Sequence, residues 1–285
     1  MNLGELRQRV DRTSNLPSLP TVVTKIIAAV DDPRACVSRL NELIGQEPAL
    51  ATRMLRLANS AYFGRRNSIV SLSQCAVVLG FNTIRSLALS ASVQRLVQQS
   101  GGKNFDPVAF WRHSLGTGVG AKVLARRAAA DSEAAMAAGL VHDIGKLVLD
   151  VVAQREYELA LADVKAGVAE KDAEIKHLGA THGEVGGWLA LKWKLPEPIV
   201  AAICWHSQPE SAGANQALAS IVHLADQITD AIDAGRQPAQ VPEALWQAAG
   251  LPFAEAEALG EELVRDWRAA EELMGAGTEP GRVAA

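Results

Sequence analysis

The sequence contains few cysteines and lacks any long apolar run. Its three cysteines, Cys36, Cys75 and Cys204, are scattered without Cys-x-x-Cys spacing, so we expect buried free thiols in a reducing compartment. No stretch approaches the ~20 uninterrupted apolar residues that a bilayer-spanning helix needs. The first residues, 1–7, also lack the apolar core of a secretory signal. These absences predict a cytoplasmic protein without a membrane partner.

The sequence also lacks an excess of positive charge. Its formal net charge is -4 at pH 7 and its pI is about 5.9, which argues against nucleic acid or an anionic membrane as the main partner. One local basic cluster leaves open a weaker alternative, a nucleic-acid-associated regulator. The simpler interpretation of that cluster is a solvated face on a helix and the loop that follows it. Its members are Arg53, Arg56, Arg65 and Arg66.

Helical periodicity is what the chain does contain. With 285 residues, 48% of them hydrophobic, it can bury a sizeable core as one large domain or two ordinary ones. Apolar residues recur at three- and four-residue spacing almost throughout, as in residues 22–30, and no stretch reads as a strand. The sequence therefore predicts an all-α fold. Helix starts are indicated by the capping-box patterns Ser71-x-x-Gln74 and Thr181-x-x-Glu184, and by Pro20, Pro48, Pro107 and Pro196.

A polar, glycine-containing stretch at residues 98–104 marks an internal boundary between two helical patterns. We expect residues 1–100 to form a bundle of about five short helices and residues 105–272 to form a second helical unit. The last residues, 275–285, contain Gly, Pro and Thr without periodicity, which predicts a mobile tail.

The segment of residues 139–147 contains the adjacent pair His142-Asp143. One imidazole and one carboxylate are a ligand pair that divalent metals accept. Apolar residues surround the pair on a helical pattern, so we expect one central, buried helix running through it. A buried Asp143 without a partner would cost several kcal/mol. Lys146, one helical turn further on, is a candidate partner.

Four further residues extend this pattern: His113 upstream, and His182, His206 and Asp226 downstream, each within a helical stretch. Their order and context resemble the HD superfamily of metal-dependent phosphohydrolases. The N-terminal half narrows the resemblance to the HDOD branch, the "HD-related output domain", over roughly residues 14 to 230. The motifs that carry this part are Leu16-Pro17-Ser18-Leu19-Pro20 and residues 46–50, 57–64, 69–72 and 76–80.

The resemblance implies a multi-helix HD-superfamily fold with an N-terminal helical subdomain, and it implies a ligand set. A first metal would be held by His113, His142, Asp143 and Asp226, and a second by His182 and His206. Such donors suit a divalent ion such as Fe, Mn, Zn or Mg. In the phosphohydrolases of the superfamily the equivalent of Lys146 faces the phosphate. Asp143 and Lys146 would therefore be the catalytic residues if the protein is an enzyme.

Two departures from the pattern affect this chemistry. Relatives of the HD-GYP phosphodiesterase type carry consecutive histidines where this chain has Trp205-His206, and an indole cannot coordinate a metal. The Gly-Tyr-Pro signature is absent, and residues 207–211 read Ser-Gln-Pro-Glu-Ser. A second metal site would be impaired, whereas a one-metal site remains chemically complete. The remaining histidines, His177 and His223, are expected to be hydrogen-bonded core residues.

Two functions follow from the resemblance. The leading hypothesis is a bacterial signal-transduction module that acts through a signalling protein partner or a bound ligand, such as a nucleotide or phosphate, without strong catalysis. The alternative is a mononuclear metal-dependent phosphohydrolase that acts on a nucleotide or phosphodiester. In the first case, a docking face is expected around Asn59, Tyr62 and Phe63.

Overall fold

The computed structural model describes residues 1–13, 16–32, 34, 36–45, 47–59, 69–99, 104 and 106–274. All regular secondary structure in these ranges is helical, which confirms the predicted all-α fold. In chain order the α-helices are α1 (Leu3–Arg12), α2 (Thr21–Val30), α3 (Val37–Gly45), α4 (Pro48–Ala58), α5 (Leu72–Leu79), α6 (Phe81–Gln99), α7 (Pro107–Arg127), α8 (Ser132–Val141), α9 (Ile144–Val152), α10 (Gln154–Lys165), α11 (Glu170–Leu178), α12 (His182–Lys192), α13 (Glu197–Trp205), α14 (Gln216–Asp233), α15 (Glu243–Ala248) and α16 (Ala256–Met274). Short 3-10 helices are η2 (Pro209–Asn215), η3 (Pro238–Gln240) and η4 (Phe253–Glu255).

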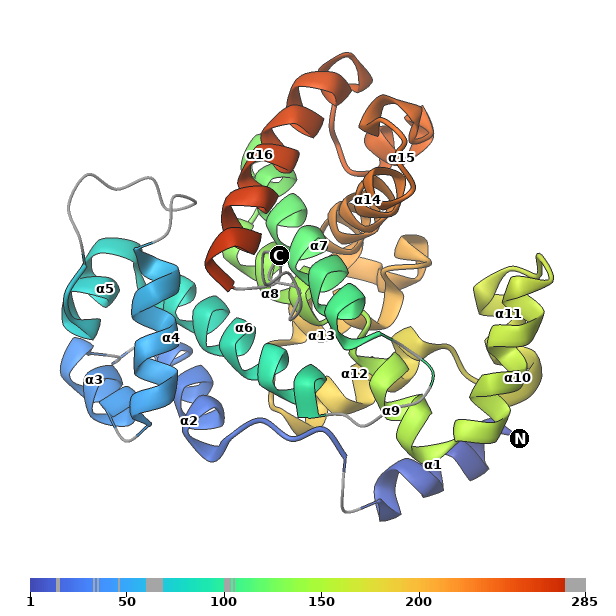
Figure 1. Ribbon diagram of the computed structural model, residues 1–285, viewed down its shortest axis with the longest axis horizontal. Helices are drawn as coiled ribbons and strands as arrows, with labels where there is room; N and C mark the ends of the chain where they lie inside the picture. Colours follow the sequence, from blue (N-terminus) through green and yellow to red (C-terminus); the bar gives the residue numbers. More distant parts are fainter. Residues whose placement is uncertain are drawn as a thin grey trace, which may run out of the picture.

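The centre of the molecule is formed by α7, which packs against α8 on one side and α14 on another (Figure 1). Glycines allow the closest of these approaches. A Cβ atom on Gly139 of α8 would lie 2.8 Å from the carbonyl oxygen of Thr117 on α7. On the outer side of α7, a Cβ on Gly116 would meet the ring of Trp267 on α16 at 2.6 Å. The close contacts of α7 with α8 and α16 therefore require glycine at these positions.

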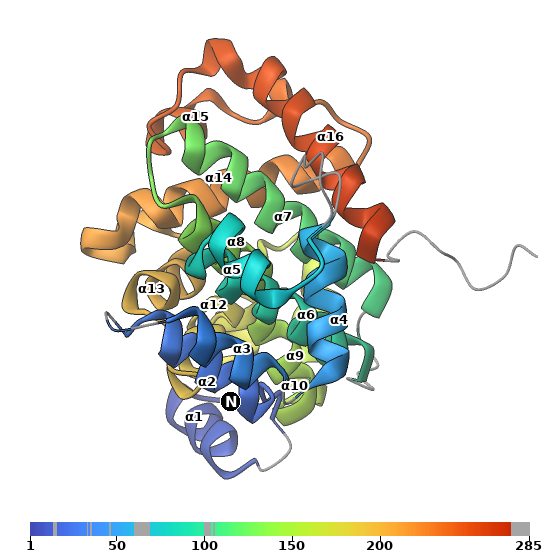
Figure 2. The same ribbon diagram turned by 90° about the vertical axis from the view of Figure 1, so that its left-hand side faces the viewer.

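The helices α2 to α5 gather at one end of the molecule, and α6 connects them to α8 (Figures 1 and 2). The first helix, α1, instead lies against α9. Its Asp11 pairs with Lys192 of α12 at 3.1 Å, and Arg9 pairs with Glu156 of α10 at 3.2 Å. The proposed division near residues 98–104 stays a prediction, because residues 100–103 lie outside the described ranges.

The helix starts follow the sequence signals with one difference. Thr181 and Glu184 form the predicted capping box at the start of α12. Ser71 accepts a hydrogen bond from the backbone of Gln74, but the side chain of Gln74 accepts from the backbone of Val70 rather than Ser71. Only half of that predicted box is therefore present. The predicted prolines stand before or at the first helical residue, with Pro20 and Pro196 as N-caps and Pro48 and Pro107 as first residues.

The predicted continuous helix through the His-Asp pair is wrong. Helix α8 ends at Val141 and α9 begins at Ile144, so His142 and Asp143 form the junction. The backbone of Asp143 has φ -92° and ψ 5°, outside the α-helical region. Apolar residues on both sides of the junction pack into the core, which is why periodicity alone reads as one helix. Both junction side chains are nevertheless buried, as expected.

The prediction of buried thiols is wrong for Cys36, which is exposed in the segment before α3. Cys204 is partly buried, and burial raises the pKa of its thiol to about 11. None of the described helices is both long and apolar enough to cross a membrane. Several predicted features lie outside the described residues: the side chains of Cys75, Arg53 and Arg56, and all of Tyr62, Phe63, Arg65, Arg66 and residues 275–285.

Candidate metal centre

The histidines and aspartates that the sequence singles out converge at the centre of the second half of the chain. They arrive from different elements: His113 from α7, His142 and Asp143 from the α8–α9 junction, His182 from the first residue of α12, His206 from the end of α13, and Asp226 from the middle of α14. The side chains of His142, Asp143, His182 and His206 are at least nine-tenths buried. The helical packing thus brings together residues separated by more than a hundred positions in sequence.

The buried histidines are held by their Nδ1 atoms. Nδ1 of His142 lies 2.8 Å from the carbonyl oxygen of Gly139, and Nδ1 of His206 lies 2.8 Å from that of Ile203. Because a carbonyl oxygen only accepts, both Nδ1 atoms must carry the proton. The Nε2 atoms are then left facing the centre of the cluster. This is the orientation that a metal-ligating imidazole needs.

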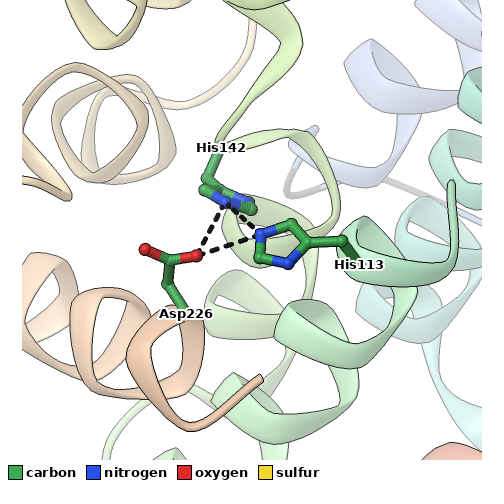
Figure 3. A group of neighbouring side chains, drawn as sticks. All are labelled: His113, His142 and Asp226. Atoms are coloured by element: carbon green, nitrogen blue, oxygen red, sulfur yellow. Dashed lines mark hydrogen bonds and ion pairs between the residues drawn. The ribbon is translucent and has the colours of Figure 1, made fainter. Parts of the chain in front are cut away.

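One group of donors consists of His113, His142 and Asp226 (Figure 3). The Nε2 atoms of the two histidines lie 3.3 Å apart. One carboxylate oxygen of Asp226, Oδ1, lies 3.0 Å from His113 Nε2 and 3.4 Å from His142 Nε2. Two imidazole nitrogens and a carboxylate oxygen therefore face one point from three elements.

A second group of donors consists of His182, His206 and Asp143. Nε2 of His182 is 3.1 Å from Nε2 of His206 and 3.2 Å from Asp143 Oδ1. The other oxygen, Oδ2, lies 3.5 Å from His142 Nε2 and 3.0 Å from the ammonium group of Lys146. Asp143 thus stands between the two groups and offers one oxygen to each.

Burial and charge act against each other at these histidines. Burial lowers the pKa of His113, but the hydrogen bond to Asp226 and the neighbouring carboxylates outweigh it, and the pKa rises to about 9. For His182, burial is likewise outweighed by Glu174 and Asp143, and the pKa rises to about 10. Burial and the imidazoles beside it lower the pKa of His206 to about 3. At neutral pH the ring of His182 is therefore doubly protonated and positively charged, whereas the ring of His206 is neutral, with its single proton on Nδ1.

The carboxylates hold negative charge despite their burial. Burial raises the pKa of Asp143, yet His142, Lys146 and His182 hold that pKa well below its usual range. Asp226 behaves in the same way beside His113 and His142, which keep its pKa low. Two buried carboxylates in their charged form need a cation close by. Protons on the imidazoles serve this purpose here, and a divalent ion would replace them.

A cavity of about 410 Å³ opens onto the cluster. Its described lining is rich in carboxylates and contains a single lysine, Lys146, which bridges Asp143 and Glu170 at 3.0 and 3.1 Å. The acidic members of the lining are Asp106, Asp143, Glu170, Asp226, Asp230 and Asp233. Without a bound cation this cavity would repel an anionic ligand.

Sequence reasoning missed several residues of the site. Glu174 accepts hydrogen bonds from both the Nδ1 and the backbone N–H of His182, at 2.9 and 2.8 Å. Asp230 lies 3.5 Å from His113 Nδ1, and burial together with the charge of Asp226 raises the pKa of Asp230 to about 6. The spacing of Asp226 and Asp230, one helical turn, was a usable signal. Glu174 stands on a different helix from His182, so no spacing rule indicates it.

The two remaining histidines differ from each other. His177 is hydrogen-bonded as expected, with its Nε2 2.8 Å from Asp163. His223 instead lines the cavity, and its buried Nδ1 has no hydrogen-bond partner among the described residues. It therefore belongs to the wall of the site rather than to a satisfied core.

The donors present fit a divalent metal. Imidazole nitrogens and carboxylate oxygens, brought within 4.8 Å of one another, form the groups His113–His142–Asp226 and His142–Asp143–His206. These are ligands of intermediate and hard character, suited to Fe, Mn or Zn. In the metal-free protein a proton on His113 or His182 lies between each pair of Nε2 atoms, which are 3.1 to 3.3 Å apart, and a divalent ion would take its place. The positions of these donor atoms and the negative charge of the carboxylates both favour a bound divalent ion.

A family model for the HDOD domain matches residues 16–209. The chain belongs to the HDOD family. A similar protein, an uncharacterized protein of Treponema pallidum (strain Nichols), is 28% identical over 242 residues, which cover 82% of this chain and 46% of that protein. The chain thus spans about half the length of the curated relative that it matches.

Two solved structures share the HDOD fold described above. One is a proposed phosphohydrolase from Shewanella amazonensis SB2B, with a TM-score of 0.79 and 26% identity over 96% of this chain and 98% of that one. The other is a proposed signal transduction protein from Marinobacter aquaeolei VT8, with a TM-score of 0.73 and 21% identity over 96% of this chain and 65% of that one. At the lower identity the likeness concerns the fold alone.

Proposed function

We propose that this HDOD protein is a signal-transduction module whose core holds a divalent metal and whose cavity binds a phosphate-bearing ligand. The observation that carries the proposal is the convergence of His113, His142, His182 and His206 on Asp143 and Asp226 beneath an open cavity. A signalling protein partner would then distinguish the ligand-bound protein from the ligand-free protein. Membership of the HDOD family, the "HD-related output domain" family, supports a role in signalling.

The charge of the cavity supports the dependence of ligand binding on metal. An anionic phosphate would meet Asp106, Glu170 and Asp230, and Lys146 is the one lysine in the described lining. A divalent ion at the cluster would supply the missing positive charge and, in a phosphohydrolase, would polarise the phosphate and generate the attacking nucleophile. Lys146 lines the cavity within ion-pair distance of Asp143, and its ammonium group would donate a hydrogen bond to a phosphate oxygen.

Hydrolysis of the ligand is the second candidate function. The open cavity and the proximity of Lys146 to Asp143 favour it. Trp205, beside His206, removes one metal-ligating side chain that the phosphodiesterase relatives carry, and this favours binding over turnover. In a hydrolytic reaction, the carboxylate of Asp143 would bind the metal, and the ammonium group of Lys146 would offset the negative charge of the phosphate.

Metal analysis tests the first part of the proposal. Protein purified without chelator should carry about one equivalent or more of Fe, Mn or Zn, and Asp143→Ala should lose it. Asp150→Asn is the control, because Asp150 is a buried carboxylate on α9, the helix that follows Asp143, and it is hydrogen-bonded to Asn104 outside the cluster. Metal-free wild-type protein that takes up no divalent ion on titration would contradict the proposal.

Calorimetry with inorganic phosphate and a simple phosphomonoester tests the second part. Binding should be present in the metal-loaded protein, absent after chelation, and weakened in Lys146→Met. Turnover of a chromogenic phosphodiester or phosphomonoester, lost in Asp143→Ala and kept in Asp150→Asn, would establish the hydrolytic candidate. Equal phosphate binding with and without metal would show that the metal is not part of ligand recognition.

A further inference from the structure

The last helix, α16, runs along the outside of the molecule in both views (Figures 1 and 2). One face of it is buried against α7: Leu263 and Trp267 fill the space left by Gly120 and Gly116. The guanidinium group of Arg112 lies over the ring of Trp267, 4.7 Å from its centroid. The inner face of α16 is therefore fully used in packing.

The outer face of α16 borders a groove of about 590 Å³, separate from the metal centre. The short helix η3 forms the other wall, where Pro238 packs directly onto Gly260. The small apolar residues Pro238, Ala239, Val264 and Ala269 contribute to its surface. The groove thus offers an apolar strip about the length of a short helix, since residues 257–269 extend about 18 Å.

The charged residues along this groove are segregated by sign. Glu257 and Glu261 lie towards the start of α16, and Arg265 and Arg268 lie towards its end. Among the described residues, Glu257, Glu261 and Arg268 have no ion-pair or hydrogen-bond partner. Arg265 is exposed and pairs only with its partly buried neighbour Asp266, at 3.1 Å. Their charges are available to a partner.

We infer that a second copy of this chain docks on this face, with the two α16 helices antiparallel. In an antiparallel pair related by a two-fold axis, each residue faces the residue at an equal distance on the other side of the axis. The midpoint between Glu257 and Arg268 lies half a residue from the midpoint between Glu261 and Arg265. Half a residue is about 0.75 Å along a helix. A single axis therefore pairs both glutamates of one copy with both arginines of the other.

The same charges exclude the parallel arrangement. Parallel helices in register would set Glu261 against Glu261 and Arg265 against Arg265, which is repulsive. One helix pair of this length is at the small end of specific interfaces. The dimer is therefore reversible, depends on protein concentration and weakens as salt screens the ion pairs.

Sedimentation equilibrium of the full chain over a range of concentrations tests this inference. The wild type should show a monomer–dimer equilibrium. Glu261→Arg and Arg265→Glu alone should each weaken it about tenfold or more, because each change creates two like-charge contacts. Glu158→Arg, an exposed change on α10, is the matched control and should have no effect. A wild type that stays monomeric at all concentrations overturns the inference.

A mixing experiment separates loss of pairing from loss of folding. Glu257→Arg with Glu261→Arg makes the face wholly basic, and Arg265→Glu with Arg268→Glu makes it wholly acidic. Each double variant should be monomeric alone, and the two should form a heterodimer when mixed. A dimer that survives in either double variant alone would locate the interface elsewhere and overturn the inference, as would failure of two folded double variants to pair.

Discussion

Nε2 of His182 lies 3.1 Å from Nε2 of His206, although the two histidines belong to different helices and are 24 residues apart. Glu174 holds the first ring and the carbonyl oxygen of Ile203 holds the second, so neither can turn away without losing a buried hydrogen bond. Imidazoles fixed in this way are arranged in advance for a shared cation. The predictions below follow from this arrangement and from the packing that supports it.

Glu174→Gln should weaken metal binding by about 10- to 100-fold, the usual effect of losing a group that orients a ligand. Glutamine would replace one carboxylate oxygen, now 2.8 to 2.9 Å from donors of His182, by an NH2 group that cannot accept, and it would remove the negative charge. Competition with a chromophoric chelator measures the affinity. Glu184→Gln, which alters a carboxylate in the first turn of α12, the helix that carries His182, should leave the affinity unchanged. Equal losses in both variants would indicate a general effect on α12.

Metal binding should release protons and tighten as the pH rises. In the metal-free protein the pKa values of His113 and His182 are raised to about 9 and about 10, so both rings carry a proton at neutral pH. Because proton and metal compete for Nε2, raising the pH towards 9 removes the competitor, and affinity rises roughly tenfold per pH unit for each displaced proton. Calorimetry in buffers of different ionisation enthalpy counts the protons. An affinity independent of pH would contradict this.

Gly145→Ala should destabilise the protein by about 3 kcal/mol, at the upper end of the range for overpacking. A Cβ at Gly145 would collide with the carbonyl oxygen of His182, and backbone on both α9 and α12 would have to move. Urea denaturation measures the loss. Gly45→Ala is the control: nothing lies within 4 Å of its Cβ, and it should be neutral or slightly stabilising. A stable Gly145→Ala variant would mean that α9 and α12 are packed less closely.

Lys122→Met should cost about 3 kcal/mol of folding free energy, because it leaves Glu133 without its ion-pair partner. Lys122 Nζ lies 2.6 Å from Glu133 Oε1, and Ser86 on α6 donates to Oε2 at 3.2 Å, so the pair links α7, α8 and α6. Adding Glu133→Gln should recover part of the loss, since the uncompensated charge is removed. A double-mutant cycle in urea measures the coupling. Additive effects would show that the pair contributes no coupling.

The helices and one helix start were predictable from the sequence, because both depend on residues only a few positions apart. Three- and four-residue apolar spacing identified helices, and Thr181 with Glu184 marked the start of α12, because capping involves residues three positions apart. The break at His142 and Asp143 was not predictable in this way. Both sides of the junction are apolar, and the close approach of α9 to α12 at Gly145 joins residues far apart in the sequence.

The sequence by itself determined the helical class, the family motifs and the identities of the candidate ligands, because these depend on residue type and short spacing. Only the tertiary structure decided that Asp143 stands between two groups of imidazoles, that Glu174 and Asp230 belong to the site, that His223 faces the cavity, and that Cys36 is exposed. These relationships join helices far apart in the chain. They are set by the close packing of α7, α8, α9, α12, α13 and α14, which no local pattern encodes.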